Sequence, residues 1–183
     1  MKDARKNARK RTRRLATSGI LAAVGVVLLY LGALIDVLDL SVAVLASLVC
    51  VFAVLEMGGA WPWLIYLVIS VLSLILLPQK SPAVVFAFFG GYYPILKAYY
   101  ERLRPFPAWG CKLIHFNLFL ALAVIAVKWI LVLPDFFLTE GPLGILLLFL
   151  AGNVVFVLYD VALTHLISSY LRVFRAKLRI RDL

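Results

Sequence analysis

Six apolar stretches, each long enough to cross a bilayer, occupy this chain from about Leu15 to Leu171. Hydrophobic residues make up 64% of the sequence and charged residues only 15%, which gives a mean hydropathy of +1.03. A water-soluble domain of 183 residues has too little interior to bury that much apolar surface. Lipid is therefore the expected solvent of the chain.

A transmembrane helix needs about 20 residues, so six spans use most of the chain and leave no room for a soluble catalytic domain. The sequence predicts an all-α integral membrane protein, a six-transmembrane-helix bundle formed by residues 15–171. Basic tails, residues 1–14 and 172–183, flank this single compact domain. The predicted spans are Leu15–Ile35, Leu38–Met57, Trp61–Leu77, Pro82–Tyr100, Trp109–Leu133 and Pro142–Leu163.

The net charge of +10 is concentrated in the two tails, with eight basic residues in the first fourteen positions and five after Leu171. Each basic run adjoins an apolar span, so attraction to anionic headgroups and the positive-inside bias explain it better than nucleic-acid binding. With six spans, both tails fall on the same side as the loop that holds Arg102, Arg104 and Lys112. We therefore expect a multi-pass protein of the inner (plasma) membrane with both termini cytoplasmic.

Polar side chains within the spans are costly and indicate either function or specific packing. One group gathers at the depth of the cytoplasmic surface: Glu56, Lys97, Glu101, His115, Asn117, Asp160 and His165. We expect Lys97 to pair with Asp160 or Glu56, and with Glu101 one turn along its own helix. Three interpretations stay open: a network that fixes helix packing, a docking surface for a partner, and a proton path. In the same region, Pro94 should kink the fourth span.

A second polar group lies toward the outer side of the predicted bundle. Lys128 precedes the end of the fifth span by five residues, which places it about 7 Å below the surface at the rise of an α-helix. Its ammonium either reaches the interface by snorkelling or points inward toward the acidic outer loops. In the second case it holds an anionic ligand or locks these loops. The ligand-binding candidates are Lys128, Asp36, Asp39, Asp135 and Glu140.

Enzymatic and metal chemistry find little support in the sequence. Cys50 falls in the middle of one span and Cys111 at the start of another, so a disulfide is not expected. His115 and His165 lie on different helices without neighbouring His or Cys residues, which is not the pattern of a metal site. The chain has no paired catalytic constellation and no glycine-rich phosphate loop. We expect no enzymatic activity, no cofactor and no metal.

The first span carries small residues at helical spacing, in the pairs Ser18/Ala22 and Gly19/Ala23. Such pairs let helix backbones approach closely in lipid, either inside the bundle or against another protein. The sequence alone leaves both uses open.

With this small-residue face, the layout resembles that of the substrate-binding S components of energy-coupling factor (ECF) vitamin transporters. The shared features are a similar length, six spans, basic cytoplasmic tails and the Asp-Leu-Ser at residues 39–41. The resemblance implies uptake of a vitamin-like solute, driven by partner ATPases, with Ser18, Gly19, Ala22 and Ala23 against a transmembrane coupling subunit. The rod-shape protein MreD has a comparable layout. A non-transporting membrane scaffold of a cell-envelope complex is therefore the alternative.

Overall fold

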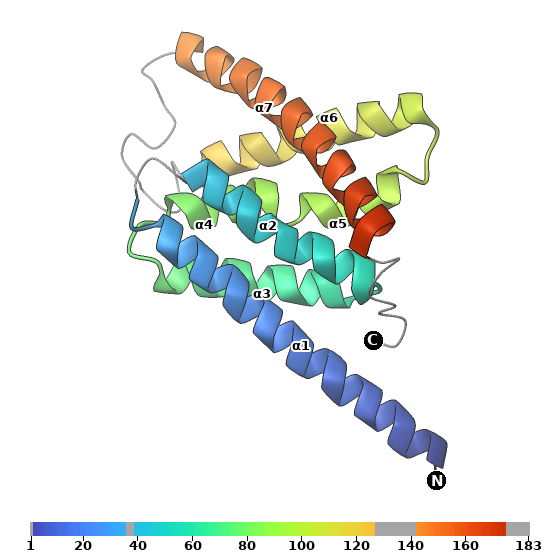
Figure 1. Cartoon of the computed structure of the whole chain (residues 1–183). Coiled ribbons are helices and arrows are strands. Elements are labelled where there is room, and N and C mark those ends of the chain that lie inside the picture. The colour runs from blue at the N-terminus through green and yellow to red at the C-terminus, as the bar shows by residue number, and fades with distance from the viewer. Residues whose placement is uncertain (1, 36–38, 127–141, 175–183) are drawn as a thin grey trace. The chain divides into compact units, whose positions relative to one another are not determined.

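A computed structural model describes residues 2–35, 39–126 and 142–174 of the chain, and every regular element in these ranges is helical (Figure 1). The all-α prediction is therefore confirmed for this part. The elements are α1 (Lys2–Gly32), α2 (Asp39–Glu56), α3 (Trp61–Leu76), α4 (Ser81–Val85), η1 (Phe86–Gly90), α5 (Tyr93–Tyr100), α6 (Pro105–Ala126), α7 (Pro142–Ser169) and η3 (Tyr170–Phe174). The two η elements are π-helical turns.

Four of the described helices are long and apolar enough to cross a membrane. The qualifying segments are Asn7–Gly32, Asp39–Glu56, Phe106–Ile125 and Leu143–Arg172. The third predicted span is present as α3, but its 16 residues make it shorter than a typical span of about 20. The basic residues before Leu15 are helical and continuous with the first apolar segment, because α1 begins at Lys2. These apolar helices are compatible with a membrane-embedded protein.

The fourth predicted span, Pro82–Tyr100, is not one continuous helix. The backbone forms α4, passes through the π-turn η1, breaks at Gly91 and Tyr92, and resumes as α5. Pro94 explains part of this break, because it has no N–H to donate and its ring clashes with a carbonyl one turn earlier. The Tyr66 hydroxyl of α3 donates to the Ala87 carbonyl at 2.9 Å, which satisfies a backbone group inside the π-turn. The predicted kink at Pro94 is thus a full interruption.

Contacts group the described residues into two compact units. The first unit contains the described residues up to Ile95 together with Phe174, and the second contains those from Leu96 to Val173. The boundary falls within α5. The first unit therefore holds α1 to η1, and the second holds α6, α7 and the end of α5.

In the first unit, α1 packs against α2 and α3 along one face (Figure 1). Its buried residues include Ser18, Ala22, Gly25, Leu29 and Gly32, which follow one another at spacings of three and four. This spacing places them on a single stripe of the helix. Small side chains dominate the stripe, so the helix axes can approach closely. The core of this unit forms where that stripe meets α2 and α3.

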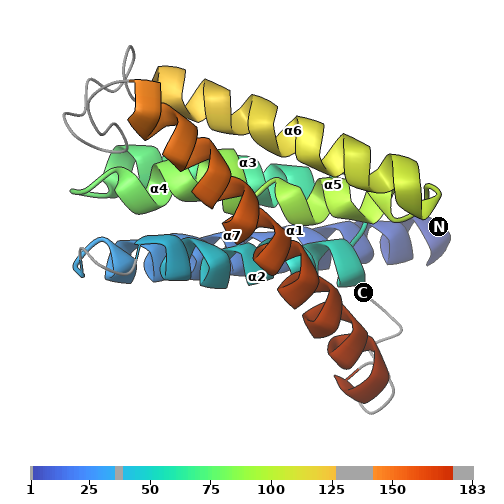
Figure 2. The same cartoon turned by 90° about the horizontal axis from the view of Figure 1, so that it is seen from above.

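In the second unit, α6 and α7 cross each other and run in opposite directions (Figure 2). The rings of Phe116 and Phe156 stack at their contact, with centroids 4.5 Å apart. The opposite faces of both helices expose large apolar side chains at intervals of four residues. These side chains are Ile114, Leu118 and Leu122 on α6, and Leu146, Leu150, Val154 and Leu158 on α7. Such stripes are poorly suited to water and well suited to lipid or to a partner.

We predict that Gly32→Ala destabilises the first unit. A Cβ atom at Gly32 would lie 2.7 Å from Val42 Cβ and 2.6 Å from Val42 Cγ1, so α1 and α2 would have to separate. Such overpacking typically costs about 1–3 kcal/mol. The matched control is Gly19→Ala on the same helix, where an added Cβ meets nothing within 4 Å. Thermal unfolding of the purified chain in detergent should separate the two variants, and equal midpoints would contradict the close approach of α1 and α2.

Candidate functional site

Most of the charged side chains that lie buried in the described part of the chain gather in the second unit, at the contact between α5, α6 and α7. We call this group the charged cluster and define it as Lys97, Glu101, Lys112, Asp160 and Thr164. Lys97 comes from α5, Lys112 from α6, and Asp160 and Thr164 from one face of α7, four residues apart. Glu101 follows the last residue of α5 and lies one turn beyond Lys97.

Lys97 lies at the centre of the cluster and is only 1% exposed. Its ammonium forms an ion pair with the Asp160 carboxylate and donates to Thr164 Oγ1 at 2.8 Å. It also lies 2.9 Å from Glu101 Oε1. Together with the Asp160 backbone carbonyl at 3.3 Å, these acceptors satisfy the three N–H donors of the ammonium group. Lys97 is therefore fully paired by the protein itself.

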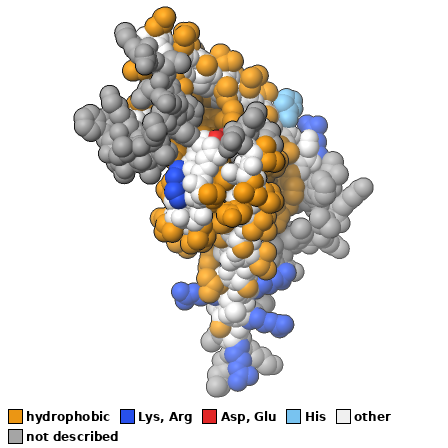
Figure 3. Space-filling model, turned by 90° about the vertical axis from the view of Figure 1, so that its left-hand side faces the viewer, with side chains coloured by type: hydrophobic (Ala, Val, Ile, Leu, Met, Phe, Trp, Pro, Cys, Tyr) orange, Lys and Arg blue, Asp and Glu red, His pale blue; other side chains and the backbone are white. Residues whose placement is uncertain are grey.

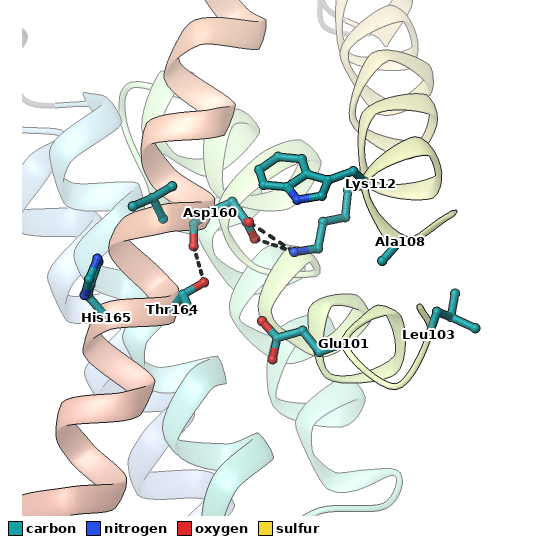
Figure 4. Close-up of a pocket in the computed structure, with 9 residues that line it drawn as sticks. Glu101, Leu103, Ala108, Lys112, Asp160, Thr164 and His165 are labelled. Carbon is teal, nitrogen blue, oxygen red and sulfur yellow. Dashed lines mark hydrogen bonds and ion pairs between the residues drawn. The ribbon is translucent and has the colours of Figure 1, made fainter. Parts of the chain in front are cut away.

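Lys112 pairs with the same carboxylate (Figure 4). Its Nζ lies 3.1 Å from Asp160 Oδ1 and 3.0 Å from Asp160 Oδ2. The ammonium also lies 5.2 Å from the centroid of the Trp109 ring, a distance at which the ring face attracts a cation. Lys112 has three N–H donors, and its two oxygen acceptors belong to one carboxylate. It is less completely paired than Lys97.

The charges of the buried groups do not balance. Two nearly buried ammonium groups, Lys97 and Lys112, share one nearly buried carboxylate, Asp160. The fourth charge, Glu101, has a side chain that is 45% exposed, so solvent screens much of its effect. The interior of the cluster therefore carries an excess of positive charge.

A hollow of about 510 Å³ borders the cluster (Figure 4). It is lined by Glu101, Leu103, Ala108, Trp109, Lys112, Asp160, Val161, Thr164 and His165. The volume falls in the range of about 300–1,000 Å³ that is typical of small-molecule sites. Apolar walls with a few convergent polar groups are also typical of such sites. This hollow is the candidate site.

Two neighbouring polar contacts hold the helices that form the hollow. Asn117 of α6 and Asn153 of α7 exchange amide hydrogen bonds of 3.0 and 2.9 Å. The Tyr100 hydroxyl lies 2.7 Å from His115 Nδ1, and the His115 ring stacks on Phe119. Along α6 the contact residues Lys112, Phe116 and Asn117 meet Asp160, Phe156 and Asn153 of α7 in reverse order. This register fixes where Lys112 meets Asp160.

The predicted pairing of Lys97 with Asp160 is confirmed, as is its pairing with Glu101 along the helix. The structure brings Lys97, Glu101 and Asp160 together and places His115 and Asn117 close by on α6. The alternative partner, Glu56, is the last residue of α2 in the first unit.

Most of the predicted ligand-binding residues lie outside the described residues, namely Asp36, Lys128, Asp135 and Glu140. The exception is Asp39, the first residue of α2. Its Oδ2 atom accepts a hydrogen bond from the Ser81 hydroxyl of α4. Asp39 thus ties two elements of the first unit, and its role toward a ligand stays a prediction.

The predicted partner-facing residues of α1 divide between two faces. Ser18 and Ala22 are buried inside the first unit, and Ser18 Oγ lies 3.9 Å from Met57 Sδ. Gly19 and Ala23 are exposed. One of the two small-residue pairs therefore packs within the unit, and the other stays accessible to lipid or protein.

Sequence reasoning assigned Lys112 to a cytoplasmic loop and missed its buried ion pair. The signal that could have found it is helical spacing, since Lys112, Phe116 and Ala123 are all buried on one face of α6. Trp109 was likewise taken only as the start of a span. No group of three or more His, Cys, Asp or Glu residues that could hold a metal occurs among the described residues. The chemistry that the site offers is ion pairing and hydrogen bonding.

We predict that Asp160→Leu strongly destabilises the second unit. The substitution leaves Lys97 and Lys112 buried without their shared carboxylate, and breaking a buried pair in this way typically costs about 3–5 kcal/mol. Replacing both lysines with Met in the same chain should recover most of the loss, because no buried charge then lacks a partner. Thermal midpoints of the single and triple variants test this, and a triple variant no better than Asp160→Leu would contradict it.

A double-mutant cycle should detect coupling between Asn117 and Asn153. In each single Asn→Leu variant the remaining amide has lost its hydrogen-bond partner. The double variant removes both amides, so neither is left without a partner. In membrane proteins such couplings average about 0.6 kcal/mol. The double variant should therefore lose less stability than the two single variants combined, and strict additivity would show that the two amides act independently.

Comparison with known proteins gives no further assignment: no protein-family model, curated protein or solved structure matches this chain. The function must be argued from the site.

Proposed function

We propose that this chain is a six-span protein of the plasma membrane that binds a small solute as the substrate-binding subunit of an ATP-driven uptake transporter. The observation that carries the proposal is the hollow of about 510 Å³ beside the Lys112–Asp160 ion pair. A solute with polar groups can exchange contacts with these charges and also contact the apolar walls. Ion pairs that only fix packing do not require a hollow beside them.

The six spans comprise the four long helices, α3, and the interrupted segment α4–η1–α5. At 16 residues, α3 extends about 24 Å and crosses with a locally thinned bilayer or polar residues at its ends. Interrupted helices occur in transport proteins where they line a polar site, and α5 contributes Lys97 to the charged cluster. Six spans place both termini on one side of the membrane. Because Lys and Arg are concentrated on that side, it is the cytoplasmic side.

In this orientation the hollow lies toward the cytoplasmic ends of α6 and α7. We assign it to the solute after entry, while Lys128 and the acidic outer loops, with Asp36, Asp39 and the pair Asp135 and Glu140, receive the solute from outside. Energy would come from partner ATPases through a transmembrane coupling subunit. The exposed Gly19 and Ala23 of α1 offer a close-packing face for that subunit.

The alternative function is a non-transporting scaffold of a cell-envelope complex, as in the MreD resemblance. The observation that favours it is the basic first part of α1, where Arg5, Arg9, Lys10, Arg11 and Arg13 are exposed. Figure 3 shows Lys and Arg side chains (blue) gathered toward the lower end of the view. An exposed basic helix can dock an acidic partner or lie against anionic headgroups. A scaffold, however, requires no bound solute.

Filling the hollow distinguishes the two functions. Val161→Trp places an indole in the hollow from α7, whereas Val157→Trp, one turn earlier, adds the same bulk outside the lining residues. We predict that native mass spectrometry of the full chain purified from its own membranes shows a bound small molecule. Wild type and Val157→Trp should retain it and Val161→Trp should lose it. Absence of any bound species from all three proteins would favour the scaffold.

Cysteine labelling in intact cells tests the topology. Three exposed positions between helices are suitable: Ala60 before α3, Pro78 after it, and Arg102 after α5. In a background without Cys50 and Cys111, six spans place cysteines at Ala60 and Arg102 inside and at Pro78 outside. If only the four long helices cross, all three positions share one side. Labelling at Pro78 therefore decides between the two arrangements.

A further inference from the structure

The charged cluster also indicates which kind of solute the hollow accepts. We infer that the hollow beside Lys112 binds a monoanionic group, a carboxylate or a phosphate diester, presented on a small apolar body. This inference rests on the proposed function, because it specifies the ligand of the same site. The anionic group can belong to a free solute or to the headgroup of an acidic lipid, since both offer the same oxygen acceptors.

The first argument is charge. Lys97 and Lys112 are nearly buried, and the one carboxylate buried with them is Asp160. A buried excess charge is unfavourable in a medium of low dielectric constant unless an opposite charge joins it. Glu101 partly serves this purpose, but it contacts only Lys97 and is 45% exposed. An anion in the hollow would complete the neutralisation next to Lys112.

The second argument is the different pairing of the two lysines. Lys97 has acceptors on Asp160, Thr164 and Glu101, and it is not among the residues that line the hollow. Lys112 lines the hollow, and among the described residues its acceptors are the two oxygens of Asp160. One of its N–H donors is thus available for a ligand oxygen. The contact would be a charge-assisted hydrogen bond, which is about twice as strong as a neutral one.

The third argument concerns the walls and the rim. Trp109, Val161, Leu103 and Ala108 provide apolar surface for the body of the ligand. Glu101 also lines the hollow, so it repels an anion and attracts a cation. The effect of Glu101 on binding therefore tests the sign of the ligand's charge. Removing Glu101 should strengthen the binding of an anion and weaken that of a cation.

Three probes of matched shape separate the ligand classes: benzoate, neutral benzamide and cationic benzylamine. Thermal midpoints of the full chain in detergent are measured over a titration of each probe. We expect stabilisation by benzoate at concentrations at which the other two have no effect. Lys112→Met should lower the affinity for benzoate at least about tenfold, as expected for a lost charged hydrogen bond. The fold should persist, because Lys97 and Asp160 still form a balanced pair.

Glu101→Gln should increase the affinity for benzoate severalfold. Lys97 retains its contacts with Asp160 and Thr164 in this variant. The matched control is Arg102→Gln, which removes an exposed charge next to Glu101 that does not line the hollow. Arg102→Gln should change the affinity for benzoate by no more than about twofold, as expected for a screened surface charge. Lys112→Arg keeps the positive charge and should retain more of the affinity than Lys112→Met.

A second arm identifies the source of the anion. The chain is placed in nanodiscs of phosphatidylcholine with or without phosphatidylglycerol, without any added probe. Stabilisation by phosphatidylglycerol that disappears in Lys112→Met assigns the site to a lipid headgroup. If only benzoate stabilises through Lys112, the site takes a free solute.

The possible failures are distinguishable. If benzamide or benzylamine stabilises the chain as well as benzoate, or if Glu101→Gln weakens benzoate, the hollow binds ligands but the anion inference is wrong. If neither the probes nor phosphatidylglycerol stabilise the chain, the hollow is not a binding site. That outcome overturns both the inference and the proposed function.

Discussion

A buried charge needs an opposite charge within contact distance, and the second unit is organised around that requirement. Asp160 on α7 supplies the carboxylate, while α5 and α6 each supply a lysine that reaches it. Because a lone ammonium in an apolar interior is so unfavourable, these helices have one acceptable alignment. The stacked Phe116 and Phe156 rings and the paired asparagines follow from the same register. The hollow lies beside Lys112, next to the side chains that converge on Asp160.

Much of this arrangement could be predicted from the sequence, because apolar length and helical spacing are local properties. They placed the long helices, and equal depth in the membrane paired Lys97 with Asp160. The role of Lys112 was not predictable in the same way, since it follows closely on Pro105 and Pro107 and was placed in the loop with Arg102 and Arg104. Proline is tolerated in the first turn of a helix, and α6 in fact begins at Pro105. Lys112 is therefore well inside the helix, on its buried face.

The small residues of α1 show a different limit of sequence reasoning. Their spacing predicted close approach but not the surface approached. In the structure Ser18 and Ala22 pack within the first unit, and the tightest approaches occur further along, where Gly25 meets Ile69 and Gly32 meets Val42. Which glycine of a helix meets a neighbour depends on the positions of the other helices. That information is distributed over the whole fold, so a single helix cannot reveal it.

The interruption between α4 and α5 has a consequence for how such chains are classified. Residues 81–100 form one apolar segment by composition, yet the backbone passes through an α-helical turn, a π-turn, a break and a second helix. Tyr66, which lies far from this segment in sequence, satisfies one of its carbonyls. Apolar length and backbone continuity are thus independent properties here. Methods that count apolar segments and methods that count uninterrupted helices will assign different topologies to proteins of this type, and both counts can be correct for the quantity each one measures.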